Sequence, residues 1–431
     1  MGVPQESWEE RDHRKLRGAD MWARRLAARW LLPVEGAPIE RGAVLIGSDG
    51  RLDAVGPDSA VPRPHDVPAV ELDNAVMLPG LINIHTHLEL TGLESGAPEH
   101  DFAAWIRRLR EQKSRRTPTE YVAAARRGLA ACYAAGVTTV ADTGDSGAVI
   151  GVLAEAGGSG VVYQEVFGPH PDQAKESLRA LQARVRDLSP LTTDRARIGV
   201  SPHAPYTVSG PLFSAVAAWA KAERLPLAVH VAESPAETEF LIAGAGPFAE
   251  AWGARGIPLP TSRGRTPIEW LADHNVLSEQ SLCIHAVQVG PRDLQRLAAS
   301  GAAVAHCPLS NRAHGHGAAP LADFLAAGIR VGLGTDSVAS VGRLDLLAEA
   351  RAVGSVTSLS ADQLLELCTL GGARALGMES ETGSLRPGKW ADCIIIRVPD
   401  GDSSPAQRVL ASSPEDVLLT CVGGREVYRS L

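Results

Sequence analysis

The sequence has 431 residues, of which 45% are hydrophobic and 21% are charged, and its formal net charge is −8 at pH 7. This composition is typical of a globular protein, and the acidic balance argues against nucleic acid as a partner. No stretch of about 18 apolar residues occurs, so neither a transmembrane helix nor a membrane partner is predicted. The six cysteines are scattered and the charged N-terminus lacks the apolar core of a secretion signal, so we expect a cytoplasmic protein with reduced thiols.

Both ends of the chain predict β-strands. Residues 1–20 are expected to form a disordered leader. Beyond them, short strand-like runs alternate with turn residues as far as residue 78. The same pattern recurs from residue 385 to the end.

Between these ends, eight short apolar runs alternate with helical stretches rich in alanine, leucine and arginine. The runs cover residues 81–89, 137–144, 160–168, 197–207, 225–234, 281–289, 301–311 and 330–340. Alternating strands and helices predict a parallel sheet, and eight units over about 300 residues match a (β/α)8 barrel of the TIM type. A doubly wound open sheet is the competing topology, but no glycine-rich phosphate-binding fingerprint follows any of these runs.

Side chains capable of chemistry gather where the predicted strands end. They are His85, His87, His203, His230, Glu233, His285, His306 and Asp336. Barrel enzymes build their active sites on that rim, because the loops there surround a pocket above a packed core. A shared location at the strand ends therefore predicts an active site.

Four of these residues have the chemistry of a metal site. His85 and His87 are two residues apart on a strand and project to the same side, although two hydrogen-bonded histidines without a metal explain that pair equally well. His230 and Asp336 follow other apolar runs. Three imidazoles and one carboxylate suit Zn²⁺ or Fe²⁺ and leave a position open for water.

Six ordered segments resemble the amidohydrolase superfamily, in the branch of deaminases and chlorohydrolases of nitrogen heterocycles. They are PGLINIHTHLE, SPHAPYT, HVAES, HCPLSN, GLGTDS and GSLRPGKWADCIII, and the similarity covers about residues 21–431. The resemblance implies a barrel over residues 79–384 and a small β-sandwich domain built from residues 21–78 and 385–431. Barrel hydrolases of this kind often pair, so a homodimer is a further expectation.

The same resemblance implies roles for individual residues. The metal ligands would be His85, His87, His230 and Asp336. Glu233 matches the acid that protonates a ring nitrogen, His285 the histidine that polarises the attacking water, and His203 a histidine that contacts the substrate. Two-metal relatives usually bridge their ions with a modified lysine at a strand end, and no lysine of this sequence ends a core strand. We therefore expect one divalent metal ion.

The proposed chemistry requires these residue types. Displacing an amine from an aromatic ring requires a strong nucleophile at neutral pH, and a bound divalent ion supplies it by lowering the pKa of its water to about 7. Attack pushes charge onto the neighbouring ring nitrogen, which Glu233 would protonate. Asp336, assisted by His285, would carry the water's proton to the departing ammonia. The competing interpretations are an exposed loop carboxylate for Glu233 and structural roles for His285 and His203.

Several further residues are candidates for substrate contact. Glu89 lies two residues beyond His87, where it would bind a purine edge or sugar hydroxyl, or else cap the following loop. Ser310 and Asn311, in HCPLSN, are also predicted to contact the substrate. FAAWIRRL at 102–109 resembles a lid segment in which Trp105 covers the pocket, the alternative being a core tryptophan.

Two unusual segments complete the set of candidates. The basic run RRLREQKSRR at 107–116 is interpreted as a solvated helix face. The HGHG segment at 314–317 is compatible with a second metal site, but its glycine-rich setting without acidic neighbours favours a substrate-side loop.

Within the branch, HTHLEL, WIRRL and SNRAHGHG most resemble the aminodeoxyfutalosine deaminases of the alternative menaquinone biosynthesis route. The expected substrate is therefore a small adenine-type nucleoside, with 6-amino-6-deoxyfutalosine as the first candidate. Deamination of methylthioadenosine or S-adenosylhomocysteine is the nearest alternative, followed by guanine or triazine deamination or dechlorination. A lactam or amide hydrolase on the same barrel would need no acid for a ring nitrogen. A metal-free scaffold protein is disfavoured because all four ligand positions are filled.

Overall fold

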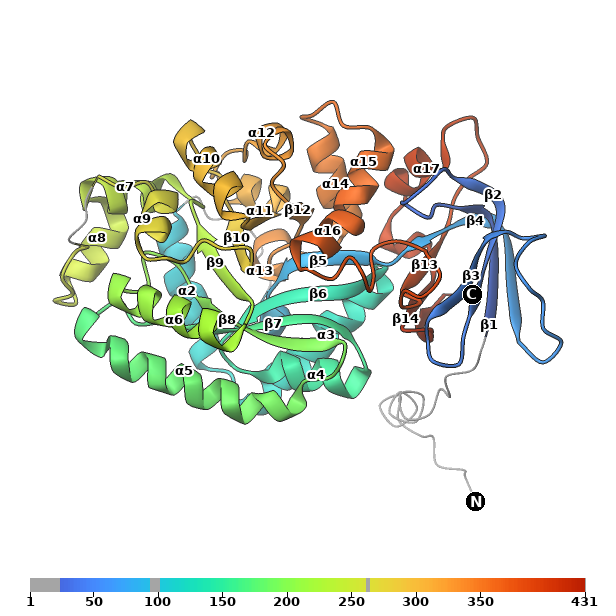
Figure 1. Ribbon diagram of the computed structural model, residues 1–431. Helices are drawn as coiled ribbons and strands as arrows, with labels where there is room; N and C mark the ends of the chain where they lie inside the picture. Colours follow the sequence, from blue (N-terminus) through green and yellow to red (C-terminus); the bar gives the residue numbers. More distant parts are fainter. Residues whose placement is uncertain (1–23, 94–100, 261–263, 431) are drawn as a thin grey trace, which may run out of the picture.

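The computed structural model describes residues 24–93, 101–260 and 264–430. The leader expected at residues 1–20 lies outside the described residues. Two bodies of secondary structure are visible, a barrel surrounded by helices and a smaller sheet beside it (Figure 1). No helix in the described ranges is both long and apolar enough to cross a membrane. All six cysteines are buried and are free thiols.

Eight parallel strands form the barrel in sequence order. They are β5 (Leu81–Thr86), β6 (Val137–Gly144), β7 (Ser159–Val166), β8 (Ala196–Pro202), β9 (Leu227–Val231), β10 (Ser281–His285), β11 (Ala303–His306) and β12 (Val331–Leu333). The two outer strands meet, because the backbone N–H of Asp336 donates to the carbonyl of His85 at 2.9 Å. The predicted TIM-like barrel is thus confirmed, and the open doubly wound sheet is excluded.

Glycine permits this closure. A Cβ atom at Gly334 would lie 2.7 Å from Cβ of His85, and one at Gly332 would lie 2.7 Å from Cα of Gly372. A side chain at Gly334 would therefore push β12 away from β5, and one at Gly332 would push it away from Gly372. The close approach brings Asp336 beside the two histidines at the end of β5.

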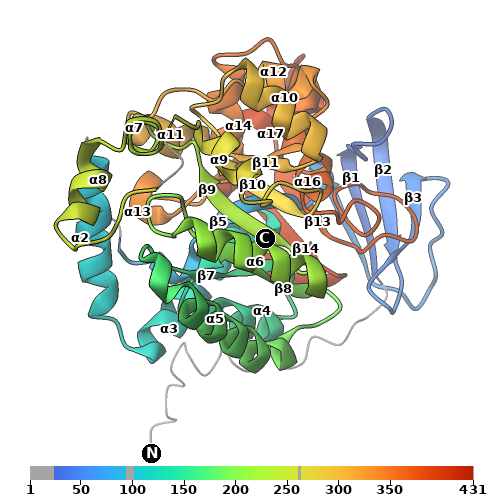
Figure 2. The same cartoon turned by 60° about the vertical axis from the view of Figure 1, so that its left-hand side comes forward.

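Helices surround the barrel (Figure 2). They are α2 (Phe102–Ser114), α3 (Pro118–Ala134), α4 (Ala148–Ala156), α5 (Ala174–Leu188), α6 (Gly210–Glu223), α7 (Pro235–Ala243), α8 (Gly246–Gly253), α9 (Pro267–Asp273), α10 (Pro291–Ser300), α11 (Pro308–Ala313), α12 (Leu321–Ala326), α13 (Val338–Val341), α14 (Leu346–Gly354), α15 (Ala361–Leu367), α16 (Leu370–Ala375) and α17 (Pro405–Ala411). In α5, for example, Leu181, Val185 and Leu188 recur at helical spacing and are buried against the barrel core. Thr117 and Glu120 form a capping box at the start of α3.

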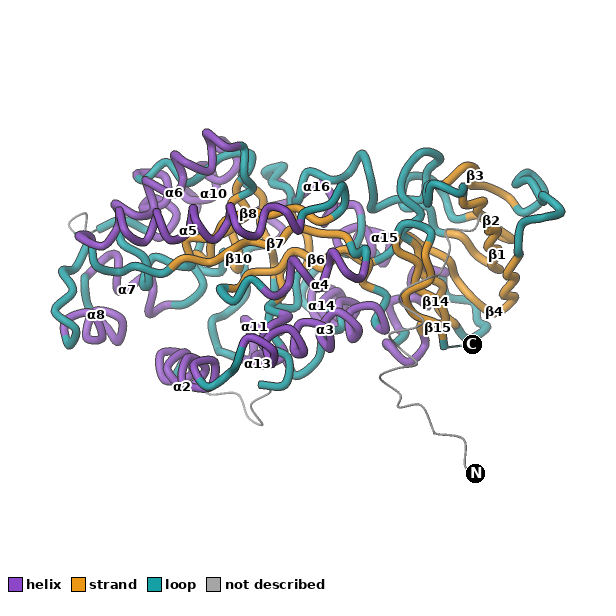
Figure 3. The backbone as a smooth tube through the Cα atoms, turned by 90° about the horizontal axis from the view of Figure 1, so that it is seen from below, coloured by secondary structure: helices purple, strands orange, loops and turns teal. Residues whose placement is uncertain are grey.

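The second body is a mixed seven-stranded sheet that both chain ends build. Its strands, in spatial order, are β15 (Arg425–Arg429), β14 (Val417–Val422), β13 (Cys393–Arg397), β4 (Ala69–Pro79), β1 (Arg24–Leu31), β2 (Ile39–Ile46) and β3 (Leu52–Pro57). Only β1 and β4 run parallel. Leu26, Val44, Met77, Ile395 and Leu419, from five of these strands, share one buried core that is separate from the barrel core. Figure 3 shows these strands grouped at one end of the molecule, as expected for the second β-domain.

Candidate active site

A cavity of about 510 Å³ opens at the C-terminal ends of the barrel strands. Its inner wall carries the polar residues that the sequence places at those ends, namely His87, His203, His230, Glu233, His285 and Asp336. Parallel strands in a closed barrel converge at one rim, so side chains far apart in sequence meet there. These six side chains therefore lie together at that rim.

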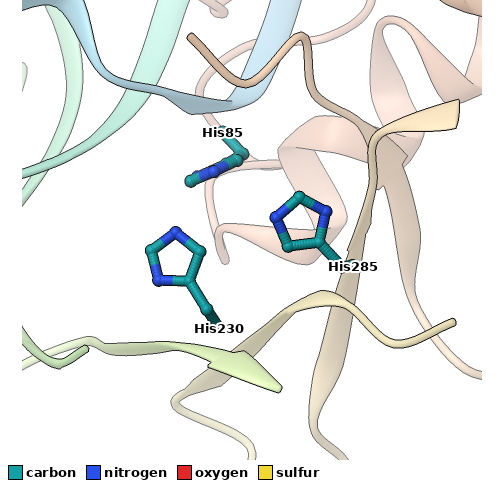
Figure 4. A group of neighbouring side chains, drawn as sticks. All are labelled: His85, His230 and His285. Atoms are coloured by element: carbon teal, nitrogen blue, oxygen red, sulfur yellow. The ribbon is translucent and has the colours of Figure 1, made fainter. Parts of the chain in front are cut away.

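The histidines and the aspartate form one compact cluster. Ligand atoms of His85, His230 and His285 lie within 4.8 Å of one another, and so do those of His85, His87 and Asp336. Nε2 of His85 and Nε2 of His87 each lie 3.5 Å from Oδ1 of Asp336. Figure 4 shows the rings of His85, His230 and His285 pointing from separate strands toward a common space.

The state of the imidazoles fits a bound cation. Both ring nitrogens of His85 are buried and make no hydrogen bond within the described part of the chain, an arrangement that costs about 1–3 kcal/mol unless a ligand satisfies it. Nδ1 of His87 faces the carbonyl of Thr143 at 2.8 Å, and Nδ1 of His230 faces that of His203 at 3.2 Å. Such contacts orient a histidine so that Nε2 is left for a metal.

Burial also keeps the rings of His87 and His230 neutral. It lowers the pKa of His87 to about 3 and the pKa of His230 well below its ordinary value of 6.5. A neutral imidazole is the form that binds a metal ion. The cluster therefore has the ligand types, proximity and protonation state of a site for a divalent ion.

Glu233 is a buried carboxyl beside the cluster. It follows β9, is buried, and has Oε1 at 3.6 Å from Nε2 of His285. The hydroxyl of Tyr206 donates to its Oε2 at 3.4 Å. Burial, reinforced by the nearby carboxylates of Asp336 and Glu237, raises the pKa of Glu233 well above its ordinary range. A carboxyl in this state holds a proton that it can donate.

A second carboxyl supports the loop that carries Glu233. The backbone N–H groups of Ala232 and Glu233 each donate to the side chain of Glu237 at 2.9 Å. Ala232 has a φ of 53°, a conformation that residues other than glycine rarely adopt. Glu237 therefore stabilises the strained turn that directs Glu233 into the cavity.

Glu237→Gln is expected to flatten the pH dependence of stability. Burial raises the pKa of Glu237 from 4.5 to about 7, so the folded protein retains a proton there that the unfolded chain releases. The stability that this proton contributes is complete below pH 4.5 and is lost as the pH rises to about 7. Between about pH 5 and about pH 7.5 the free energy of unfolding should fall by about 2–3 kcal/mol more in the wild type than in the variant. Urea titrations at the two pH values measure the free energy of unfolding. A decrease of the same size in the wild type and in the variant would contradict the prediction.

His285 and Asp336 are held in position by a short helix. Nδ1 of His285 lies 2.9 Å from Oδ1 of Asn311, and the hydroxyl of Ser310 donates to Oδ2 of Asp336 at 2.6 Å. Both Ser310 and Asn311 belong to α11, are buried, and do not line the cavity. We expected Ser310 and Asn311 to contact the substrate, but in the structure they contact Asp336 and His285 instead.

Glu89 also differs from its expected placement. Strand β5 ends at Thr86, and Glu89 lies in a 3-10 turn (Leu88–Leu90), so the same-face argument does not apply. Its carboxylate accepts hydrogen bonds from the backbone of Asp145 and Ser146 and pairs with Lys113 at 3.3 Å. Glu89 is not part of the cavity wall. It stabilises the loop between β6 and α4, and neither of its expected roles, contact with a substrate or capping of the loop that follows it, is seen.

The lid expected at residues 102–109 is a helix along the cavity. Trp105 and its neighbours on α2 line the wall, and Trp105 stacks with Phe102. The ring of His314 packs against Trp105, with 4.5 Å between ring centroids, and the ring of His316 packs against Phe102, with 4.6 Å between centroids. Among the described residues, neither of these histidines belongs to a group close enough to hold a second metal ion. The HGHG segment thus packs against α2, and Nδ1 of His316 also lies 3.7 Å from Oε1 of Glu233.

The chain matches the family model described as the amidohydrolase family over residues 76–427. That match covers most of the sequence. The chain belongs to the amidohydrolase family. Membership of this family makes it a hydrolase.

Similar proteins include deaminases. The amidohydrolase is 33% identical to an aminodeoxyfutalosine deaminase of Deinococcus radiodurans, with 83% of this chain and 86% of the relative covered. It is 30% identical to a 5-methylthioadenosine/S-adenosylhomocysteine deaminase of Moorella thermoacetica, with 92% and 91% covered. A crystal structure of an adenosine deaminase from Xanthomonas campestris with bound zinc has the same fold, with a TM-score of 0.80, 23% identity, and 94% and 92% covered.

Sequence reasoning missed several polar residues on the wall of this amidohydrolase, among them Glu165, Lys113 and Tyr206. Glu165 lies at the end of β7, within 4.8 Å of ligand atoms of His203 and His230, and burial raises its pKa well above the ordinary range. The rule that identified the histidines, position at a strand end, would also have found Glu165. Lys113 on α2 and Tyr206 carried no such signal, because their place depends on how helices and loops pack above the rim.

Proposed function

We propose that this amidohydrolase deaminates an adenine-type nucleoside by hydrolysis and that it holds one divalent metal ion. The ligands would be His85, His87, His230 and Asp336. Three imidazoles and a carboxylate suit Zn²⁺ or Fe²⁺, and the similar structure from Xanthomonas campestris contains zinc. Such an ion would supply a nucleophile at neutral pH by lowering the pKa of a water molecule.

The residues of the chain would manage the protons. Nδ1 of His285 faces the side-chain oxygen of Asn311 and therefore carries a hydrogen, which leaves Nε2 to accept a hydrogen bond from the water and polarise it. Asp336 would take the first proton of the water and pass it to the departing amine. Glu233 would protonate the ring nitrogen next to the attacked carbon and take up the second proton of the water as the carbonyl forms. The balance is one water consumed, one carbonyl formed on the ring and one ammonia released.

The observation that carries this proposal is the buried carboxyl of Glu233 beside the cluster. Amide or lactam hydrolysis protonates only the nitrogen that leaves, and the attacking water can supply that proton, so it does not require a second acid for a ring nitrogen that stays bound. Ring deamination does. Burial favours the protonated form of Glu233, and its Oε1 lies 3.6 Å from Nε2 of His285.

Aminodeoxyfutalosine is the first candidate substrate, which would place the enzyme in menaquinone biosynthesis. The identity of 33% to the aminodeoxyfutalosine deaminase supports it. Methylthioadenosine and S-adenosylhomocysteine are the alternatives, supported by the relative from Moorella thermoacetica at 30% identity.

Ammonia release by the metal-loaded protein tests the proposal. The panel contains aminodeoxyfutalosine, methylthioadenosine, S-adenosylhomocysteine, guanine and an N-acyl compound. We expect ammonia from adenine-type nucleosides, with aminodeoxyfutalosine turned over fastest. Cleavage of the N-acyl compound without ammonia release from any nucleoside would reject deamination.

A further inference from the structure

Three arginines line the outer part of the cavity. Arg107 and Arg110 belong to α2, and Arg255 follows α8. The two helices lie at the same end of the barrel in Figure 2. The sequence-based interpretation of residues 107–116 as a solvated helix face is thus only partly right, because the face that carries these arginines borders the cavity.

These arginines differ from the other cation on the wall. Lys113 is paired with Asp145 at 2.7 Å and with Glu89 at 3.3 Å, so its charge is already compensated. Arg107, Arg110 and Arg255 are exposed, and within the described ranges none of them forms an ion pair with an acidic side chain. The carboxyl groups on the wall belong instead to its inner part, at or just beyond the strand ends.

A continuous aromatic surface connects the reactive centre to this cationic part. The hydroxyl of Tyr206 contacts Glu233, and the ring of Tyr206 stacks on Phe248 at 4.1 Å. The indole N–H of Trp252 donates to the carbonyl of Tyr206 at 2.8 Å, and the backbone N–H of Arg255 donates to the carbonyl of Trp252 at 3.0 Å. One wall therefore offers an acid, then apolar rings, then a guanidinium.

We infer that the outer part of the cavity binds a carboxylate at the far end of the substrate's substituent, joined to the nucleoside through an aromatic or apolar segment. The inference rests on the proposed function and deepens it. Guanidinium groups recognise carboxylates through paired N–H donors, and aromatic walls bind flat apolar groups. A neutral substituent would leave the three charges unused. A zwitterionic amino acid would bring an ammonium group into the same positive region.

Selectivity between substrates tests the inference. Aminodeoxyfutalosine ends in a benzoate, methylthioadenosine is neutral there, and S-adenosylhomocysteine ends in a zwitterion. For the wild type we expect kcat/KM to be at least about tenfold higher with the benzoate substrate than with methylthioadenosine. Each exposed charge pair contributes a factor of up to about five, and the factors of several pairs multiply. Replacing Arg107, Arg110 and Arg255 together with glutamine should reduce this ratio about tenfold through KM, and high salt should reduce it in the wild type.

Arg292→Gln, on the exposed face of α10, is the matched control and should leave the ratio unchanged. A ratio that the triple variant does not alter would overturn the inference, as would a wild type that prefers methylthioadenosine or S-adenosylhomocysteine. If no nucleoside releases ammonia, the proposed function fails. Calorimetric binding of the same three nucleosides then decides the inference separately, because equal affinities for the benzoate and neutral compounds would reject it.

Discussion

Glu233→Gln is expected to lower kcat by about 10²–10⁴-fold, the range typical for loss of a general acid. Glutamine keeps the size of the side chain and an oxygen for the hydroxyl of Tyr206, but it has no acidic proton to give to a ring nitrogen. Initial rates of ammonia release at saturating substrate measure the effect. KM should change little, because the contribution of the acid grows as the nitrogen gains charge during the attack.

The matched control for this variant is Glu239→Gln on the same helix-loop unit. Glu239 is exposed on α7 and does not line the cavity, so we expect kcat to stay at the wild-type value. Thermal unfolding of both variants checks that the fold is retained. If Glu233→Gln retained full activity on a nucleoside, another group would have to be the proton donor and the assignment would be wrong.

Asp336→Ala is expected to release the metal ion and abolish turnover. The variant removes one of the four side chains that we propose as ligands, and even changes to residues that only support a ligand lower metal affinity about 10–100-fold. Elemental analysis should show about one divalent ion per wild-type chain, as in single-ion hydrolases with three histidines and a carboxylate, and only traces in the variant. Binding to the folded state also stabilises a protein, so the melting temperature of the wild type should rise when the ion is added.

Asp323→Ala serves as the control, because Asp323 is an exposed residue of α12 that lies away from the cavity. Chelation of the wild type should reproduce the effect of Asp336→Ala, and added Zn²⁺ or Fe²⁺ should restore activity to the chelated wild type only. A wild type that contains no transition metal, or whose activity is unchanged after chelation, would contradict the proposed site.

The convergence of the reactive residues could be predicted because it follows from local patterns and one topological rule. His85, His230, His285 and Asp336 each follow an apolar run at or just beyond its end, and in a closed parallel barrel all such ends share one rim. The spacing of His85 and His87 fixed their common direction. The family was likewise recognisable from ordered motifs, and the matched range of residues 76–427 confirms it.

The contacts of Glu89, Ser310 and Asn311 could not be predicted in the same way. Each lies a few residues beyond a strand, where the chain turns into a 3-10 turn or a short helix, so a period of two no longer describes the side-chain direction. Their partners, Lys113 for Glu89 and His285 for Asn311, are distant in sequence. Only packing determines which of them meet.

Strand periodicity and the position of a residue after a strand are local properties, so the amino-acid pattern predicts the barrel, the histidines and the aspartate at its rim and the carboxyl beside them. Packing between distant segments determines which polar groups face the cavity and which support those that do. It also decided the polarity of the cavity. Arg107 and Arg110 on one helix and Arg255 after another are separated by more than a hundred residues, and only the packing of α2 and α8 against the same rim places their charges around one opening.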